Sequence, residues 1–354
     1  MAMAAASATA DQVRPSTESA ESDYQLSLKY EKGDGLPKDE RKAVALALKA
    51  AEQGHAGAQE RAGFIYKLGL GGTPKDITKA VEWFKRAADS DRVVSQLMLG
   101  SMLQDGSEVP RDLKAAAKYF AKAAAHGQPV AQYSLALMYL KGEGVNSDLA
   151  RAVELLSAAS EQGLAQAQNE LGLRYRNGEG VAVDFAKAVQ LFQRAAEQGL
   201  PKAQFCLGQM YYYGRGTSLD YTTAQRWLKK AADRGEGDAA AFLGVMSGNG
   251  QGVTKDINEM IRWYTVAANA NSSQGQAMLA TCYHKGEGVD PDRVAAWKWY
   301  TLALESGVPG AEEDLKQGRQ AVEKMMTPDE LERAKGLVKD FVTNRQKQKD
   351  TSKR

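Results

Sequence analysis

The chain has 354 residues, 34 of them glycine, with two cysteines, three histidines and a net charge of +2 from 46 basic and 44 acidic residues. Glycine is above its usual share of about 7%, yet 43% hydrophobic and 25% charged residues favour a folded protein over a disordered one. The near balance of charge argues against electrostatic binding to nucleic acid or membranes, and two cysteines are too few for a disulfide framework.

The first 22 residues are rich in alanine, serine, threonine and glutamate. This composition is typical of a disordered tail, and no run of about twenty apolar residues occurs that could span a membrane. Ala6-Ser7-Ala8 is similar to a signal-peptidase site, but no basic segment and no leucine-rich core precede it. We therefore expect a disordered tail over residues 1–22 and a cytoplasmic protein. The alternative is an exported or periplasmic protein, if this segment is a trimmed signal.

The sequence pattern repeats about every 36 residues from residue 23 to residue 311. Eight Gly-x-Gly-like steps mark the period, and they begin at Gly33, Gly69, Gly106, Gly142, Gly178, Gly214, Gly250 and Gly286. An aspartate follows each step, at Asp39, Asp76, Asp112, Asp148, Asp184, Asp220, Asp256 and Asp292. One spacing of 37 places a single extra residue in the loop around Gly71. Eight copies in register predict a repeat protein.

Each repeat is predicted to be a pair of antiparallel helices, as the fifth copy illustrates. Apolar and small residues at helical spacing predict a first helix from about Ala165 to Asn177, which Gly178 would end as a left-handed C-cap. Asp184 is predicted to cap the second helix, which would end near Gly199. Because stacked repeats bury a common core, we predict an all-α fold. Its architecture would be a right-handed α/α superhelical solenoid of about eight 36-residue helix-pair repeats with a C-terminal capping helix.

Two recurring positions of the first helix indicate how the helices pack. One position is small in all eight copies, at Ser27, Gly63, Gly100, Ala136, Gly172, Gly208, Gly244 and Ala280. Glycine inside a helix costs about 1 kcal/mol relative to alanine, so its recurrence indicates that another helix approaches closely. The position three residues later is a tyrosine at Tyr30, Tyr66, Tyr139, Tyr175, Tyr211 and Tyr283. This pattern favours core packing.

The repeat pattern ends where Lys316 takes the small position. Thr327-Pro328-Asp329-Glu330 then has the sequence of a capping box with proline at the first helical position. We predict capping helices over residues 312–344, the last of them ending near Phe341. Residues 345–354 contain five basic residues and one acidic residue. We expect this segment to be a solvated basic tail rather than a nucleic-acid-binding arm.

The residues of one copy resemble the Sel-one-like repeat (SLR): Ala203-Gln204-x-x-Leu207-Gly208-x-Met210-Tyr211, then Gly214-x-Gly216, Asp220, Ala224, Trp227 and Ala231-Ala232. This family is related to the tetratricopeptide repeat, and the resemblance covers residues 23–311. It implies a non-catalytic scaffold that holds protein partners in membrane-complex assembly, endoplasmic-reticulum quality control, envelope polysaccharide machinery or contact between bacteria and host. A cysteine-rich branch of the family has a disulfide in each helix pair. Cys206 and Cys282 lack that pattern, and we expect both to be buried.

The residue types that commonly serve in catalysis are not spaced in the sequence as a catalytic site requires. His55, His126 and His284 occupy three different positions of the repeat, and none has a second ligand at metal-binding spacing. The Gly-x-Gly steps follow helices and lack the lysine of a phosphate-binding loop, and the aspartates lie one to a repeat. We therefore expect a protein that is not an enzyme, with no catalytic residue, no cofactor and no metal.

Partner binding is predicted on the face of the first helices that points away from the core. In the family that the repeats resemble, this face is expected to line the inner, concave surface. The candidate partner-binding residues on it are Tyr133, Leu137, Asn169, Leu173, Arg176, Phe205, Gln209 and Tyr212. The alternative is that packing between repeats buries most of these side chains.

The function that we predict is a protein–protein interaction scaffold or adaptor that presents a concave solenoid surface to a protein or peptide. The alternative is an exported factor that assembles or binds an envelope polysaccharide, or that takes part in bacteria–host interaction. We expect a monomer that binds no nucleic acid and inserts into no membrane.

Overall fold

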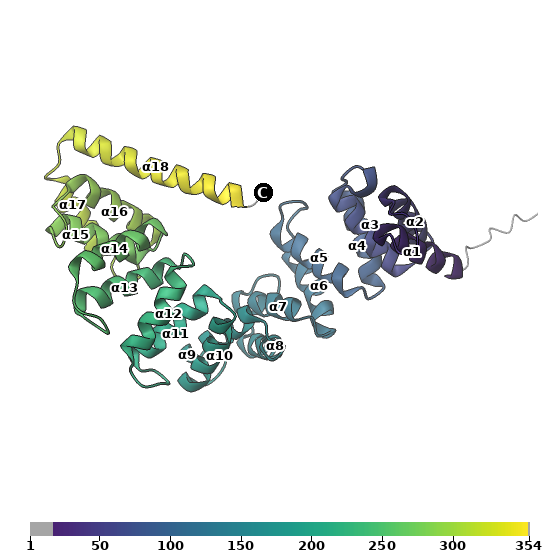
Figure 1. The fold of residues 1–354 in the computed structure, drawn as a ribbon, viewed down its shortest axis with the longest axis horizontal. Helices are drawn as coiled ribbons and strands as arrows, with labels where there is room; N and C mark the ends of the chain where they lie inside the picture. Colours follow the sequence, from purple (N-terminus) through teal and green to yellow (C-terminus); the bar gives the residue numbers. More distant parts are fainter. Residues whose placement is uncertain (1–16, 353–354) are drawn as a thin grey trace, which may run out of the picture. The chain divides into compact units, whose positions relative to one another are not determined.

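Helices make up the regular secondary structure of the computed structural model, which describes residues 17–352 (Figure 1). Within these residues the chain forms eighteen α-helices, one short 3-10 helix and no strand, so the predicted all-α class is confirmed. The predicted disordered tail falls mostly on residues 1–16, which lie outside the described residues. The helices belong to two compact units, which divide between Gln162 and Gly163.

Unit 1 contains four helix pairs, one for each of the first four repeats. Its helices are α1 (Thr17–Lys32), α2 (Glu40–Glu52), α3 (Ala56–Leu68), α4 (Ile77–Asp89), α5 (Val93–Asp105), α6 (Leu113–Ala125), α7 (Pro129–Lys141) and α8 (Leu149–Glu161), with the 3-10 helix η1 (Leu70–Gly72) after α3. Consecutive α-helices of the unit pack against one another. Because the links are short, these neighbours run antiparallel.

The first helix begins earlier than the sequence predicts. α1 starts at Thr17, so residues 17–22, which we expected to belong to the tail, are helical. Ala20 is buried, and Oε2 of Glu21 lies 2.8 Å from Nε2 of His55, the residue that caps α3. These contacts with the second repeat stabilise a helical turn whose polar composition alone predicts disorder.

Unit 2 contains the other four helix pairs and two C-terminal helices. Its helices are α9 (Ala165–Asn177), α10 (Phe185–Glu197), α11 (Pro201–Tyr213), α12 (Tyr221–Ala232), α13 (Gly237–Asn249), α14 (Ile257–Asn269), α15 (Ser273–Lys285), α16 (Arg293–Ser306), α17 (Glu312–Glu323) and α18 (Pro328–Ser352). α9 has the bounds that the sequence predicts, which confirms the interpretation of the fifth repeat.

The repeated aspartates cap the second helices, as predicted. In all eight repeats the aspartate Oδ1 accepts a hydrogen bond of 2.9–3.0 Å from the backbone N–H three residues later. The first glycine of each step has φ between 62° and 75°, at the end of the first helix. Both caps satisfy backbone groups that a helix end leaves unpaired, so they fix the loop inside each repeat.

A buried glutamine joins the first helix of a repeat to the second helix of the repeat before it. Gln96, Gln132, Gln204 and Gln276 each donate from Nε2 to the backbone carbonyl eight residues earlier, at 3.1–3.5 Å. That carbonyl lies in the last turn of the preceding second helix. The hydrogen bond therefore crosses the junction between two repeats, and it explains why a polar residue recurs at a buried position.

The small position of the first helix lies against a large side chain of the second helix of the same repeat, as predicted. A methyl group added to Gly100 would lie 2.7 Å from the ring of Phe120, and one added to Gly172 would lie 2.7 Å from the ring of Phe192. Both rings are buried. Glycine at this position therefore makes room for an aromatic side chain that fills the core of the repeat.

The second glycine of the loop packs against the preceding repeat. A methyl group at Gly144 would overlap the backbone carbonyl of Leu113, the first residue of α6. One at Gly216 would overlap the carbonyl of Phe185, the first residue of α10. At Gly35, in the first repeat, nothing lies within 4 Å of the same position. This glycine thus allows the loop of one repeat to lie on the second helix of the repeat before it.

An ion pair replaces this glycine contact in the third repeat, where Glu108 stands at the position of the second glycine. Its carboxylate pairs with Lys67 at the end of α3 and with Lys75, whose Nζ lies 3.3 Å away. Both lysines belong to the second repeat, so the contact again connects consecutive repeats. The hydrogen bond from Lys67, assisted by that from Lys75, lowers the pKa of Glu108 below its ordinary value near 4.5.

The substitution Glu108→Gln is expected to lower the free energy of unfolding by up to about 1 kcal/mol at pH 7. Because the pKa of Glu108 is lowered in the folded state, its contribution is complete above the unfolded value near 4.5 and is lost as pH falls through the folded value. Urea unfolding of both proteins between about pH 7 and pH 3 measures the difference. A difference that stays constant down to the lowest pH would contradict the ion pair.

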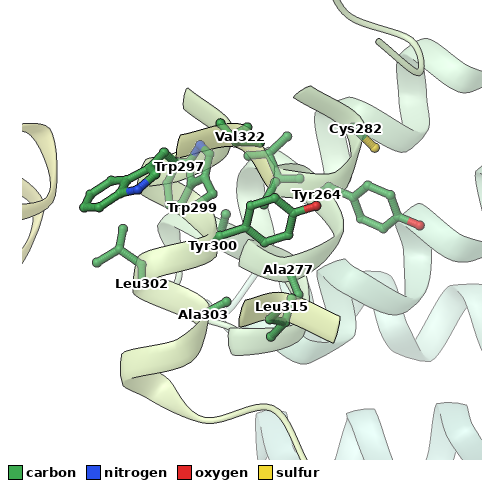
Figure 2. Packing of buried hydrophobic residues seen from close by; sticks show 14 of the residues in the cluster. Tyr264, Ala277, Cys282, Trp297, Trp299, Tyr300, Leu302, Ala303, Leu315 and Val322 are labelled. Atoms are coloured by element: carbon green, nitrogen blue, oxygen red, sulfur yellow. The ribbon is translucent and has the colours of Figure 1, made fainter. Parts of the chain in front are cut away.

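The C-terminal helices close the core of unit 2, as predicted (Figure 2). Leu315 and Val322 of α17 are buried in the cluster of aromatic side chains on α16. α18 also packs against α16, with Ala334 fully buried and the ring of Phe341 5.5 Å from that of Trp299, edge to face. These apolar contacts cover the last repeat, which has no following repeat to pack against it.

The last helix is longer than predicted. α18 extends to Ser352 rather than ending by residue 344, so the start of the predicted basic tail, residues 345–354, is helical. Its beginning is the predicted capping box, in which Thr327 Oγ1 accepts from the Glu330 N–H at 3.2 Å and Glu330 Oε2 accepts from the Thr327 N–H at 2.8 Å. Beyond the core, Arg345 donates to Oδ1 of Asn271 in the turn after α14, at 2.6 Å. This distant contact stabilises a segment that its sequence predicts to be a tail.

Candidate protein-binding surface

The eight predicted partner-binding residues lie on three first helices. Tyr133 and Leu137 are on α7 in unit 1, and the six others are on α9 and α11 in unit 2. Seven of the side chains are half-buried. Asn169 is only 7% exposed, and its amide oxygen has no hydrogen-bond partner among the described residues. Packing of the helices therefore removes Asn169 from the predicted surface, and a binding role for the other seven stays a prediction.

Polar side chains connect α9, α11 and the loop after α13 in unit 2. Arg176 Nη1 donates to Oε1 of Gln209 at 3.4 Å, from α9 to α11. Tyr212, one turn after Gln209, donates from its hydroxyl to Oε1 of Gln251 in the loop after α13, at 2.8 Å. Burial raises the pKa of Tyr212 above its ordinary value near 10, so the hydroxyl keeps its proton at neutral pH. The surface thus spans three consecutive repeats.

Four aromatic rings gather on the same surface. Phe205 and Tyr212 of α11 lie 5.6 and 5.5 Å from Phe242 of α13, both edge to face. Tyr213 lies 4.8 Å from Tyr212 and 6.2 Å from Phe242, and half of its side chain is exposed. Such a cluster presents rigid apolar area with polar edges, which is the composition typical of protein-binding hot spots.

Two of these rings, Tyr213 and Phe242, are absent from the surface that the sequence predicts. Tyr213 ends the run Tyr211-Tyr212-Tyr213, and three consecutive residues of a helix cannot all face its core. That run is a signal from which an exposed tyrosine could have been inferred. Phe242 has no such signal, because the residues at its position in the other repeats are unrelated in type.

Two arginines belong to the same surface. Arg215, in the loop after α11, lies over the ring of Tyr213 at 5.2 Å and near that of Phe185 at 6.0 Å. Neither Arg215 nor Arg176 forms an ion pair with any residue of the described chain. We refer to the following residues together as the aromatic–arginine surface: Arg176, Gln209, Tyr212, Tyr213, Arg215 and Phe242.

Charged groups on and directly before the first helices of unit 1 pair with each other instead. Arg61 Nη1 lies 2.6 Å from a carboxylate oxygen of Glu31, and Arg92 Nη2 lies 2.7 Å from one of Glu60. Ser95 also donates its N–H and hydroxyl to Glu60. Because these charges are satisfied between repeats, they are less available to a partner than the two arginines of unit 2.

The two cysteines and His55 have structural roles. Cys206 and Cys282 are buried, as expected, and burial raises the pKa of each thiol to about 11, which keeps both protonated and unreactive at neutral pH. His55 accepts a hydrogen bond from the Ala58 N–H as the N-cap of α3. Between residues 17 and 352 no group of three potential ligand side chains is placed to hold a metal ion.

Comparison with known proteins identifies the repeat. The Sel1 repeat model matches eight consecutive segments, at residues 20–55, 56–91, 93–128, 129–164, 165–200, 201–236, 237–272 and 273–308. The chain belongs to the Sel1 repeat family. Sel1 repeat proteins are in general non-catalytic scaffolds for protein–protein interaction. In the part of the chain that the structure describes, no helix is both long enough and apolar enough to cross a membrane.

Two solved Sel1 repeat structures are similar over most of this chain. A Sel1 repeat protein from Oxalobacter formigenes is 30% identical with a TM-score of 0.65, over 84% of this chain and 86% of that one. The protein c5321 of uropathogenic Escherichia coli, a protective antigen with an SLR fold, is 29% identical with a TM-score of 0.63, over 92% of this chain and 76% of that one. No curated protein sequence matches significantly. The helix-pair solenoid architecture is confirmed by these neighbours.

Proposed function

We propose that this Sel1 repeat protein is a scaffold or adaptor that binds a protein or peptide through the aromatic–arginine surface of unit 2. The observation that carries the proposal is the half-exposed Tyr213, which stands in a cluster of edge-to-face rings with Arg215 over its own ring. Rigid aromatic side chains lose little conformational freedom on binding, and a few of them supply most of the affinity of an interface.

Cross-linking from Tyr213 tests the proposal. A photoreactive phenylalanine at position 213 is expected to capture a partner, whereas the same residue at Met325, which is also exposed but lies after α17, is expected not to capture it. The captured protein is then purified and its affinity for the unmodified chain is measured. Tyr213→Ala and Phe242→Ala are each expected to weaken binding about tenfold or more, because each removes ring area from the interface.

The matched control is Val266→Ala on α14, which removes an exposed apolar side chain outside the surface. It is expected to leave the affinity unchanged. Thermal unfolding of all three variants separates binding from stability, since the exposed ring of Tyr213 contributes little to the core. Equal affinity of Tyr213→Ala, Phe242→Ala and the unsubstituted protein would contradict the proposal.

A further inference from the structure

We infer that the aromatic–arginine surface selects an acidic peptide segment, one in which carboxylate side chains flank an aromatic residue. This inference rests on the proposed function and adds to it the chemistry of the partner. Three properties of the surface carry it: the hydrogen bonds of Arg176, the placement of Arg215, and the charged residues on α9, on α11 and in the loops that follow them.

Arg176 has no charged acceptor. Its Nε donates to Oδ1 of Asn177 at 3.2 Å and its Nη1 donates to Oε1 of Gln209 at 3.4 Å, both neutral amide oxygens at long distances. Hydrogen bonds from a guanidinium to a carboxylate are shorter and about twice as strong as those between neutral groups. A carboxylate from a partner would therefore replace these weak contacts with stronger ones.

Arg215 lies against aromatic rings and leaves its donors unused. Its guanidinium is 5.2 Å from the ring centre of Tyr213 and 6.0 Å from that of Phe185, and its side chain donates no hydrogen bond to the residues described. A guanidinium that contacts a ring with its face can still bind a carboxylate through its N–H edge. The ring of Tyr213 thus orients a second carboxylate-binding group.

No acidic side chain among the residues described pairs with either of these two arginines. Residues 201–219, which form α11 and the loop after it, contain Lys202 and Arg215 and no acidic residue. The carboxylates of α9 and of the Gly-x-Gly step after it, those of Glu170 and Glu179, both pair with Arg174. The six residues of the aromatic–arginine surface thus include two cations and no carboxylate, and an acidic segment with an aromatic residue complements them in charge and in polarity.

A pair of synthetic peptides tests this inference on the full-length protein. The probe is the fluorescein-labelled, C-terminally amidated peptide Gly-Glu-Phe-Glu-Pro-Glu-Phe-Glu-Gly, and its control has glutamine in place of every glutamate. Fluorescence anisotropy is expected to show affinity for the acidic peptide at least about tenfold higher than for the neutral one. Raising the salt concentration from about 50 to about 500 mM is expected to weaken binding of the acidic peptide alone.

The double variant Arg176→Gln/Arg215→Gln is expected to lose this preference. Lys255→Gln/Arg293→Gln removes the same charge from two exposed residues outside the surface and is expected to keep it. Equal affinity for both peptides, with both weakened by Tyr213→Ala, would overturn the acidic preference and leave the proposed binding surface intact. Binding that neither Tyr213→Ala nor the double arginine variant changes would overturn the inference, and the capture experiment at position 213 would then decide the proposed function separately.

Discussion

Gly144→Ala is expected to lower the free energy of unfolding by about 2–4 kcal/mol. Gly144 has φ of 73°, a conformation that costs an L-residue about 1 kcal/mol or more. The larger part of the effect comes from contact, because the new methyl group overlaps the backbone carbonyl of Leu113 in the preceding repeat. A backbone carbonyl at a helix start cannot rotate away as a flexible side chain can, so the loop must move off the neighbouring repeat.

Gly35→Ala is the matched control for this prediction. Gly35 occupies the same loop position with nearly the same φ, 71°, but nothing lies within 4 Å of the added methyl group. The substitution Gly35→Ala is expected to lower the free energy of unfolding only by the cost of the backbone conformation, about 1 kcal/mol. Urea unfolding followed by circular dichroism measures both. Equal losses at the two positions would show that the loop contact between repeats contributes nothing to stability.

Gly172→Leu is expected to lower the free energy of unfolding by about 1–3 kcal/mol, even though leucine is the better helix former. A methyl group alone would stand 2.7 Å from the ring of Phe192, and this ring is fully buried. The ring is enclosed by protein, so to make room for leucine either it leaves its rotamer or α9 and α10 separate.

Gly336→Ala serves as the control within a helix. Gly336 lies in α18 with nothing within 4 Å of an added methyl group, so the substitution is expected to stabilise the protein by up to about 1 kcal/mol. The two variants should thus shift the urea midpoint in opposite directions. A midpoint unchanged by Gly172→Leu would mean that α9 can move away from α10 at no measurable cost.

Local signals account for the part of the fold that the sequence predicts correctly. The bounds of α9 and the N-caps from Asp39 to Asp292 follow from residues within one turn of each helix end, and these contacts need no information about the rest of the chain. The close approach at Gly172 is also predictable, because an unfavourable residue that recurs at a helical position requires a compensating contact.

Long-range contacts account for what the sequence does not predict. α1 begins at Thr17 because of contacts with the second repeat, and α18 continues past Phe341, where Arg345 binds Asn271, 74 residues away in sequence. The prediction of the candidate surface from the sequence is incomplete for the same reason. Helical spacing places residues on a face, but it does not reveal that Asn169 is covered or that Phe242 reaches the rings of α11.

The glutamine hydrogen bonds at the junctions between repeats have a consequence for the rate of folding. Each bond closes a span of only eight residues, and the main packing contacts join helices that are consecutive or next to consecutive in the chain. Chains dominated by such local contacts fold fast for their size, because little loop entropy is lost before the contacts form. Each junction can therefore form as soon as two neighbouring helices exist, so ordering can start in any repeat and spread in both directions.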